Sequence, residues 1–262
     1  MSNSVNPLLA KIQLPGRIFN LPSRAALYND GEVDAQAIGG EIQVHPMSAL
    51  NEINLKNPDL LFNGKALVAV LGECVPSIKK PLELFGRDVD AILFFLRLVT
   101  YGPEYRIEVA HDCEGAKNHS YAVDLEKIIM NMKQLDPTII EQKRMITLST
   151  GHQVYTRPMK IKDIVALFHS HGNKKELTDE DIKKLAVTNL MSMIEKVDDI
   201  TNRDFIEEWV RMLTTPMVTK ITDAAQELND WGPETVTTLT CRDCQGEMRV
   251  ELPLNPISFF SS

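Results

Sequence analysis

Apolar residues recur at helical spacing in the middle of the chain. Between residues 87 and 100 they form one stripe, as expected of a helix with one face on a core: Val89, Ile92, Leu93, Leu96 and Val99. Residues 179–197 predict a second long helix. It opens with Thr178 and, three positions later, Asp181, which resembles a capping box. These two segments indicate a substantial helical part.

Shorter helices and strands surround these two segments. Helical patterns cover residues 48–60, 125–133, 203–213 and 220–228. Alternating apolar and polar residues predict strands at 17–21 and 41–45, and a β-hairpin over 145–158. The apolar run 64–74 is bounded by glycines, and its periodicity leaves helix and strand open. The part from Leu71 to Pro76 is interpreted as buried β-structure.

One helix–hairpin pattern occurs twice. An aromatic-Gly-Pro-Glu sequence ends a helix at 101–104 and again at 231–234. Each copy continues with a β-rich run, a cysteine-containing turn closed by glycine, and a second β-rich run. The recurrence of five features in the same order predicts two related units that pack as a pseudo-symmetric pair.

The cysteine-containing turns suggest a metal site. Cys241 and Cys244 form a Cys-x-x-Cys knuckle, and Cys113 occupies the equivalent turn of the first copy. Zinc is held by four cysteine or histidine ligands in structural sites. The fourth ligand is either His111, in the same turn as Cys113, or His119, where that hairpin returns. We expect a structural zinc ion here, with no catalysis, because all four positions would be filled by protein.

Other chemistry is less well supported by the sequence. A redox role for the Cys-x-x-Cys pair would need a following helix, whereas a β-rich run follows here. Cys74 is a remote candidate ligand. His169 and His171 have the spacing of a metal hydrolase site, but no carboxylate cluster accompanies them, and we expect them at a solvated helix end.

Composition and charge restrict the partners. The chain has 262 residues, 44% of them hydrophobic and 24% charged, with a formal net charge of −8. An acidic chain has no overall attraction to nucleic acid or to anionic lipid, so we expect protein partners. Four cysteines are few for a disulfide scaffold, and the start lacks a secretory signal pattern. These features predict a cytosolic protein with reduced thiols.

The predicted fold class is α+β, a mainly helical body with short β-hairpins, two of them zinc-ribbon-like. The expected divisions are a β-rich arm and helix over 1–84, the first helix–hairpin unit over 85–135, a hairpin and helical region over 136–230, and the second Cys hairpin with a tail over 231–262. The first and last units should pack as one body. Phe259 and Phe260 are expected to pack against the last hairpin, with a role as partner anchors as the alternative.

Several stretches resemble a family of baseplate proteins of T4-like contractile-tailed bacteriophages, assigned to the central baseplate hub or its assembly. These stretches are LPSRAALY, GEIQVHPMSALNEINLKNPDLLFNGKALVAVL, DVDAILFFLRLVTYGPE and CRDCQGEMRVELPLNPISFF. The resemblance is densest over 21–125 and the last twenty residues, and loose over 160–230. In the first unit, Ala-His-Asp-Cys stands at 110–113 where a second Cys-x-x-Cys is expected.

The resemblance implies a non-enzymatic tail protein that acts through contacts with other hub or tail proteins, as a structural subunit or an assembly factor. It would be present in the host cytoplasm during assembly, and in the virion if it stays in the baseplate. The alternative function is a zinc-ribbon adaptor that binds nucleic acid or another regulatory partner. The acidic charge disfavours nucleic acid, and a DNA-binding assay at low salt distinguishes the two.

Overall fold

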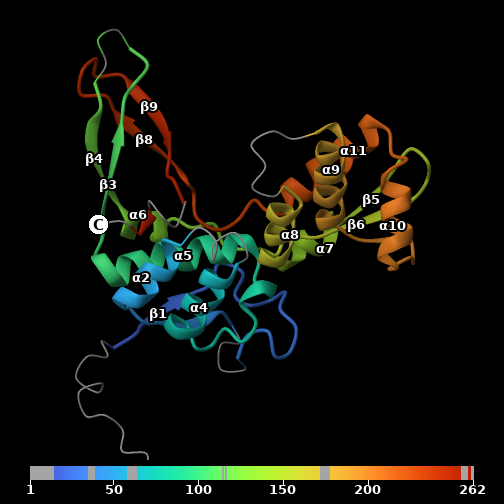
Figure 1. Ribbon diagram of the computed structural model, residues 1–262, viewed down its shortest axis with the longest axis horizontal. Coiled ribbons are helices and arrows are strands. Elements are labelled where there is room, and N and C mark those ends of the chain that lie inside the picture. The colour runs from blue at the N-terminus through green and yellow to red at the C-terminus, as the bar shows by residue number, and fades with distance from the viewer. Residues whose placement is uncertain are drawn as a thin grey trace, which may run out of the picture.

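The computed structural model describes residues 15–34, 39–57, 64–113, 115, 117–171, 178–254 and 259–260. It is a mixed α+β fold with small antiparallel sheets, as the sequence predicts (Figure 1). One group of helices and strands surrounds α5, and a second comprises α8–α11 with a three-stranded sheet. Two β-hairpins, β3–β4 and β8–β9, rise together from the α5 group (Figure 1).

The strands and helices follow the chain in this order: β1 (Arg17–Asn20), β2 (Glu41–Val44), α2 (Ala49–Leu55), α4 (Lys65–Cys74), η2 (Pro81–Glu83), α5 (Gly86–Tyr101), β3 (Glu104–Val109), β4 (His119–Asp124), α6 (Leu125–Met130), α7 (Pro137–Lys143), β5 (Met145–Thr147), β6 (Gln153–Thr156), α8 (Ile161–His171), α9 (Asp179–Met193), β7 (Ile194–Val197), α10 (Arg203–Val210), α11 (Thr215–Glu227), β8 (Val236–Thr240) and β9 (Glu247–Glu251).

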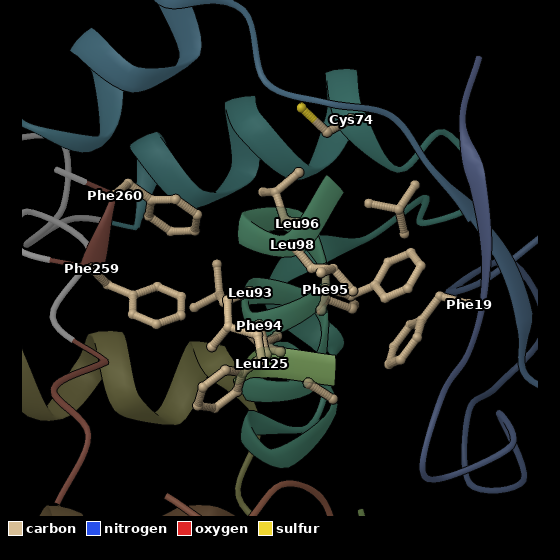
Figure 2. Packing of buried hydrophobic residues seen from close by; sticks show 14 of the residues in the cluster. Phe19, Cys74, Leu93, Phe94, Phe95, Leu96, Leu98, Leu125, Phe259 and Phe260 are labelled. Atoms are coloured by element: carbon tan, nitrogen blue, oxygen red, sulfur yellow. The ribbon is translucent and has the colours of Figure 1, made fainter. Parts of the chain in front are cut away.

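Helix α5 lies at the centre of the main core. The predicted apolar stripe is confirmed, but burial extends around the helix, since every residue from 91 to 98 is buried. Phe19 of β1 stacks on Phe95 with ring centroids 4.6 Å apart (Figure 2). The first strand pair therefore covers one face of α5. The helix ends as predicted, with Gly102 at a φ of 91°.

The C-terminal aromatic residues close the opposite part of this core. Phe259 and Phe260 are fully buried. Phe259 meets Phe94 of α5 and Tyr105 of β3 edge-on, at centroid distances of 5.3 and 5.1 Å (Figure 2). They are core anchors, as expected, and they belong to the same hydrophobic cluster as Met248 of β9 in the last hairpin. The ring contacts are to α5 and β3.

Buried Arg97 also holds the tail in place. Its guanidinium donates a hydrogen bond to the Phe259 carbonyl and lies 4.4 Å from the Tyr105 ring centroid. The Tyr101 hydroxyl donates to the Phe260 carbonyl over 3.2 Å. Two backbone carbonyls of the tail are thereby satisfied inside an apolar core, which keeps their burial from being costly.

A second core lies between the three-stranded sheet and α9–α11. Its buried members include Val154 of β6, Leu190 of α9 and Ile206 of α10. The predicted helix over 179–197 is wrong at its end, because α9 stops at Met193 and β7 follows. Ile194 is fully buried and pairs with Thr156 of β6, so sheet pairing outweighs the helical pattern there.

Three other expectations are refined or corrected. The undecided run 64–74 is helix α4, with Ala66, Val70 and Cys74 buried at i, i+4 and i+8. Its interpretation as buried β-structure near Leu71 is therefore wrong. Helix α11 begins at Thr215, five residues before the predicted start, and the sequence analysis did not predict α7. The end of the helical pattern expected over 48–60 falls outside the described residues.

The capping box expected at Thr178 is present, and α2 begins with a second one at Ser48. Ser48 accepts a hydrogen bond from the Asn51 amide at the start of α2, and Thr178 accepts one from the Asp181 amide at the start of α9. The short 125–133 prediction corresponds to α6, and the 203–213 prediction to α10. Of the helices that the structure describes, none combines the length and apolar character needed to cross a membrane.

The base of the second hairpin is fixed beside α5. Trp231 is buried in a small core with Phe85, and the two rings lie edge-to-face at 6.3 Å. Arg87 of α5 donates hydrogen bonds to the Trp231 carbonyl over 2.6 Å and to the Pro233 carbonyl over 2.8 Å. Both hairpins therefore start from the surroundings of the same helix, which brings their turns into reach of each other.

Candidate metal centre

The two hairpins carry the candidate site at their turns. In the first, β3 and β4 pair antiparallel up to Val109 and His119. In the second, β8 and β9 pair up to Thr240 and Glu247. Both turns lie at the end of the hairpins farthest from α5 (Figure 1). Residues more than 120 positions apart in the sequence therefore meet there.

The turn of the second hairpin is tight and carries both cysteines of the Cys-x-x-Cys pair. The Cys241 amide donates to the Gly246 carbonyl over 2.8 Å, and the Gln245 amide donates to the Cys241 carbonyl over 3.0 Å. Gln245 has a φ of 60°, so the left-handed position lies one residue before the glycine. A Cβ at Gly246 would lie 3.3 Å from Cys244 Sγ, which is tighter than usual. Glycine at this position therefore lets the backbone approach the sulfur atom.

Four side chains with metal-binding atoms converge between the turns. They are His111, Cys113, Cys241 and Cys244, here called the Cys/His cluster, and their ligand atoms all lie within 4.8 Å of one another. His111 Nδ1 is 3.2 Å from Cys244 Sγ, and the Sγ atoms of Cys113 and Cys241 are 4.0 Å apart. A tetrahedral zinc ion with the usual zinc–sulfur and zinc–nitrogen bond lengths separates its ligand atoms by about 3.5–3.8 Å. The spacing therefore fits one tetrahedral ion.

The cluster also has the electrostatics of a thiolate site. Amide groups of Cys244 and Asp243 hydrogen-bond the Cys241 sulfur and lower its pKa to about 7. Desolvation, followed by the neighbouring thiols, raises the pKa of Cys113 to about 12. Without a cation, ionisation of one thiol opposes ionisation of the next. A divalent cation would remove this conflict, because metals bind the deprotonated sulfur.

The structure distinguishes the two candidate histidines. His111 belongs to the Cys/His cluster, whereas His119 lies outside it. The Nε2 atom of His119 is 2.9 Å from Asp243 Oδ2, in a cross-hairpin pair. The geometry therefore favours His111 as the fourth ligand over His119.

The remaining candidates lie apart from the cluster. Cys74 is buried in α4 with its sulfur 3.8 Å from Asn51 Oδ1, and desolvation raises its pKa to about 11. His169 is exposed near the end of α8, and α8 ends at His171, as the helix-end interpretation expects. The His171 side chain is outside the described part of the structure. Among the described residues, no group of potential metal ligands includes Cys74 or His169.

The comparison with protein families identifies the chain's relatives. The family model described as T4 bacteriophage base plate protein matches residues 47–261. The chain belongs to this family. The match confirms the resemblance found in the sequence and extends over the loosely similar stretch 160–230. Comparisons with curated proteins and with solved structures gave no match.

The matched range of this base plate family protein contains the whole Cys/His cluster and the tail anchor Phe259. Two residues beside the cluster, Tyr121 and Asp243, were not predicted from the sequence. Asp243 stands between the two cysteines of the knuckle, and its carboxylate was the available signal. Tyr121 lies two positions after His119 in β4, so both side chains share one face of that strand.

Proposed function

We propose that the protein is a non-enzymatic component of the baseplate hub, either as a structural subunit or as a factor in hub assembly. The observation that carries this proposal is the family match over 47–261. Large apolar side chains exposed on the described helices support a role in protein contacts. Leu50 and Ile53 of α2 are 65% and 62% exposed, and Phe205 of α10 is 60% exposed. These surfaces suit docking onto other hub or tail proteins.

A phage that carries an early stop codon in this gene tests the proposal. Electron microscopy of infected-cell lysates should show filled heads without attached tails and no complete baseplates. A synonymous change at the same codon is the matched control, and the intact gene supplied from a plasmid should restore tails. Normal tails in the stop-codon phage would contradict the hub assignment.

The Cys/His cluster supports a structural zinc ion within this protein, bound by His111, Cys113, Cys241 and Cys244. Two antiparallel hairpins with cysteine-containing turns would then form a zinc-ribbon-like pair, and the recurring helix–hairpin order supports an internal repeat. Four protein ligands leave no open coordination position, so the ion would stabilise the fold without catalysis. It would act as a clasp between the first and last hairpins.

Metal content tests the clasp. Protein purified under reducing conditions should contain one zinc ion per chain by elemental analysis, and the Cys244→Ser variant should contain none. Cys74→Ser is the matched control, because Cys74 lies outside the cluster, and it should leave the metal content unchanged. Unaltered metal content in Cys244→Ser would refute the site.

A zinc-ribbon adaptor for nucleic acid is the second candidate, and only the knuckle geometry favours it. The net charge of −8 opposes it, since nonspecific binding depends on phosphate contacts with basic residues. Binding of duplex DNA at low salt that weakens steeply as salt is added would support this candidate. Absence of binding at low salt would eliminate it for duplex DNA.

A further inference from the structure

The knuckle of the second hairpin rests on β4 through the two residues between its cysteines. The Arg242 amide donates to the Tyr121 hydroxyl over 3.2 Å, and the Arg242 guanidinium lies 5.2 Å from the Tyr121 ring centroid. Asp243 Oδ2 is 2.9 Å from His119 Nε2 and accepts a hydrogen bond from the Lys117 amide over 3.1 Å. These contacts join the hairpins without involving any atom of the Cys/His cluster.

Strand alternation explains why one face of β4 receives the knuckle. His119 and Tyr121 are two residues apart, so their side chains point to the same side of the hairpin. Tyr121 is buried, and the side chains of His119 and Asp243 are 25% and 29% exposed. A partly buried, hydrogen-bonded pair restricts position more than a fully exposed pair does. The contacts therefore fix where the knuckle sits along β4.

We propose that His119 and Tyr121 are positioning residues for the metal, acting through Asp243 and Arg242. This inference rests on the proposed metal clasp and deepens it. His111 and Cys113 come from one turn, and Cys241 and Cys244 from another, so the tetrahedron forms only if the two turns keep their register. The contacts of His119 and Tyr121 with the knuckle hold that register before any ion enters.

The alternative role for His119 is that of a metal ligand, and the geometry disfavours it. A histidine that binds a metal commonly gives its other ring nitrogen to a carboxylate, and Asp243 is a carboxylate partner of His119. However, the ligand atoms that converge within 4.8 Å include His111 Nδ1 and neither nitrogen of His119. His119 is thus a support for the knuckle, and His111 supplies the nitrogen ligand.

Cobalt titration separates these roles, because Co²⁺ in a tetrahedral thiolate site absorbs visible light in a way that reports its ligand set. Asp243→Asn and His119→Ala should bind Co²⁺ about 5-fold more weakly than the unaltered protein, because each loses one partly buried polar contact that holds the two turns in register. Their spectra at saturation should match that of the unaltered protein. His111→Ala should change the spectrum, because a nitrogen ligand is lost.

Asp112→Asn is the matched control for charge. Asp112 lies between His111 and Cys113 as Asp243 lies between Cys241 and Cys244, and its side chain is exposed. This control should retain the affinity of the unaltered protein. Far-ultraviolet circular dichroism checks that each variant is folded, and Tyr121→Phe, which removes only the hydroxyl, should also weaken binding while leaving the spectrum unchanged.

Three results would overturn the inference. Unchanged Co²⁺ affinity in Asp243→Asn, His119→Ala and Tyr121→Phe would show that these contacts do not position the knuckle. A changed spectrum in His119→Ala together with an unchanged one in His111→Ala would make His119 the ligand. No Co²⁺ binding by the unaltered protein would refute the metal clasp itself, and the inference with it.

Discussion

Removal of the metal should destabilise the protein strongly, because the clasp would join distant parts of the chain. Cys113 and Cys241 are separated by 128 positions. A cross-link between them lowers the conformational entropy of the unfolded chain, whereas the folded chain already holds the two residues together. The Cys113→Ser variant, or a chelator added to the unaltered protein, releases this constraint.

The expected magnitude follows from loop-closure entropy. A cross-link that closes a loop of this length contributes about 5 kcal/mol to the free energy of unfolding at 25 °C. For a domain of this size, 1 kcal/mol corresponds to about 2–4 °C in melting temperature, so the clasp is worth about 10–20 °C. Cys241 and Cys244 can still hold metal in the unfolded chain, which makes this an upper value.

Thermal unfolding followed by circular dichroism, with and without chelator, measures this effect. The unaltered protein should melt at a lower temperature when chelator is added, and Cys113→Ser should melt at the lower temperature in both conditions. The absence of a chelator effect on Cys113→Ser is the control for nonspecific destabilisation. A melting temperature of the unaltered protein that does not respond to chelator would refute the reasoning.

Three further predictions concern the rest of the fold. Phe259→Ala should cost about 3–5 kcal/mol in urea unfolding, because the ring is fully buried; a loss below about 1 kcal/mol would contradict its role as a core anchor. Thr178→Ala should cost about 1 kcal/mol through loss of the α9 cap, with no change expected for a Thr178→Ser control. Desolvation raises the pKa of buried Asp88 from 3.8 to about 6, so its protonated form favours folding. This stability is complete below about pH 4 and is lost as the pH rises through 6, at a cost of about 3 kcal/mol. Urea unfolding at pH 4 and 7 should show a smaller difference for Asp88→Asn, and an equal one would contradict the assignment.

Local sequence patterns were a better guide to the cysteines of the candidate site than to the course of the chain around them. The cysteine-containing turns predicted Cys113, Cys241 and Cys244 as neighbours, and the structure brings these three side chains together. Only the three-dimensional structure could favour His111 over His119. In an antiparallel hairpin both lie near the turn, and only the docking of the second hairpin shows which ring nitrogen faces the sulfur atoms.

The errors in the secondary structure have two physical causes. Strand β7 continues a helical pattern without a break, and its strand form depends on pairing with β6, far away in sequence. Helix α4 is apolar on several sides, so its periodicity was weak. The ring contacts of Phe259 with α5 and β3 were not predicted, since they join the end of the chain to its first half.

The most direct test of the central claim, a role in the baseplate, is quantitative mass spectrometry of purified virions beside unfinished tails from infected cells. The account predicts the protein in the unfinished tails at a fixed ratio to other baseplate proteins. Its presence in virions at the same ratio would make it a structural subunit, and its loss from virions would make it an assembly factor. Absence from both preparations would contradict the account.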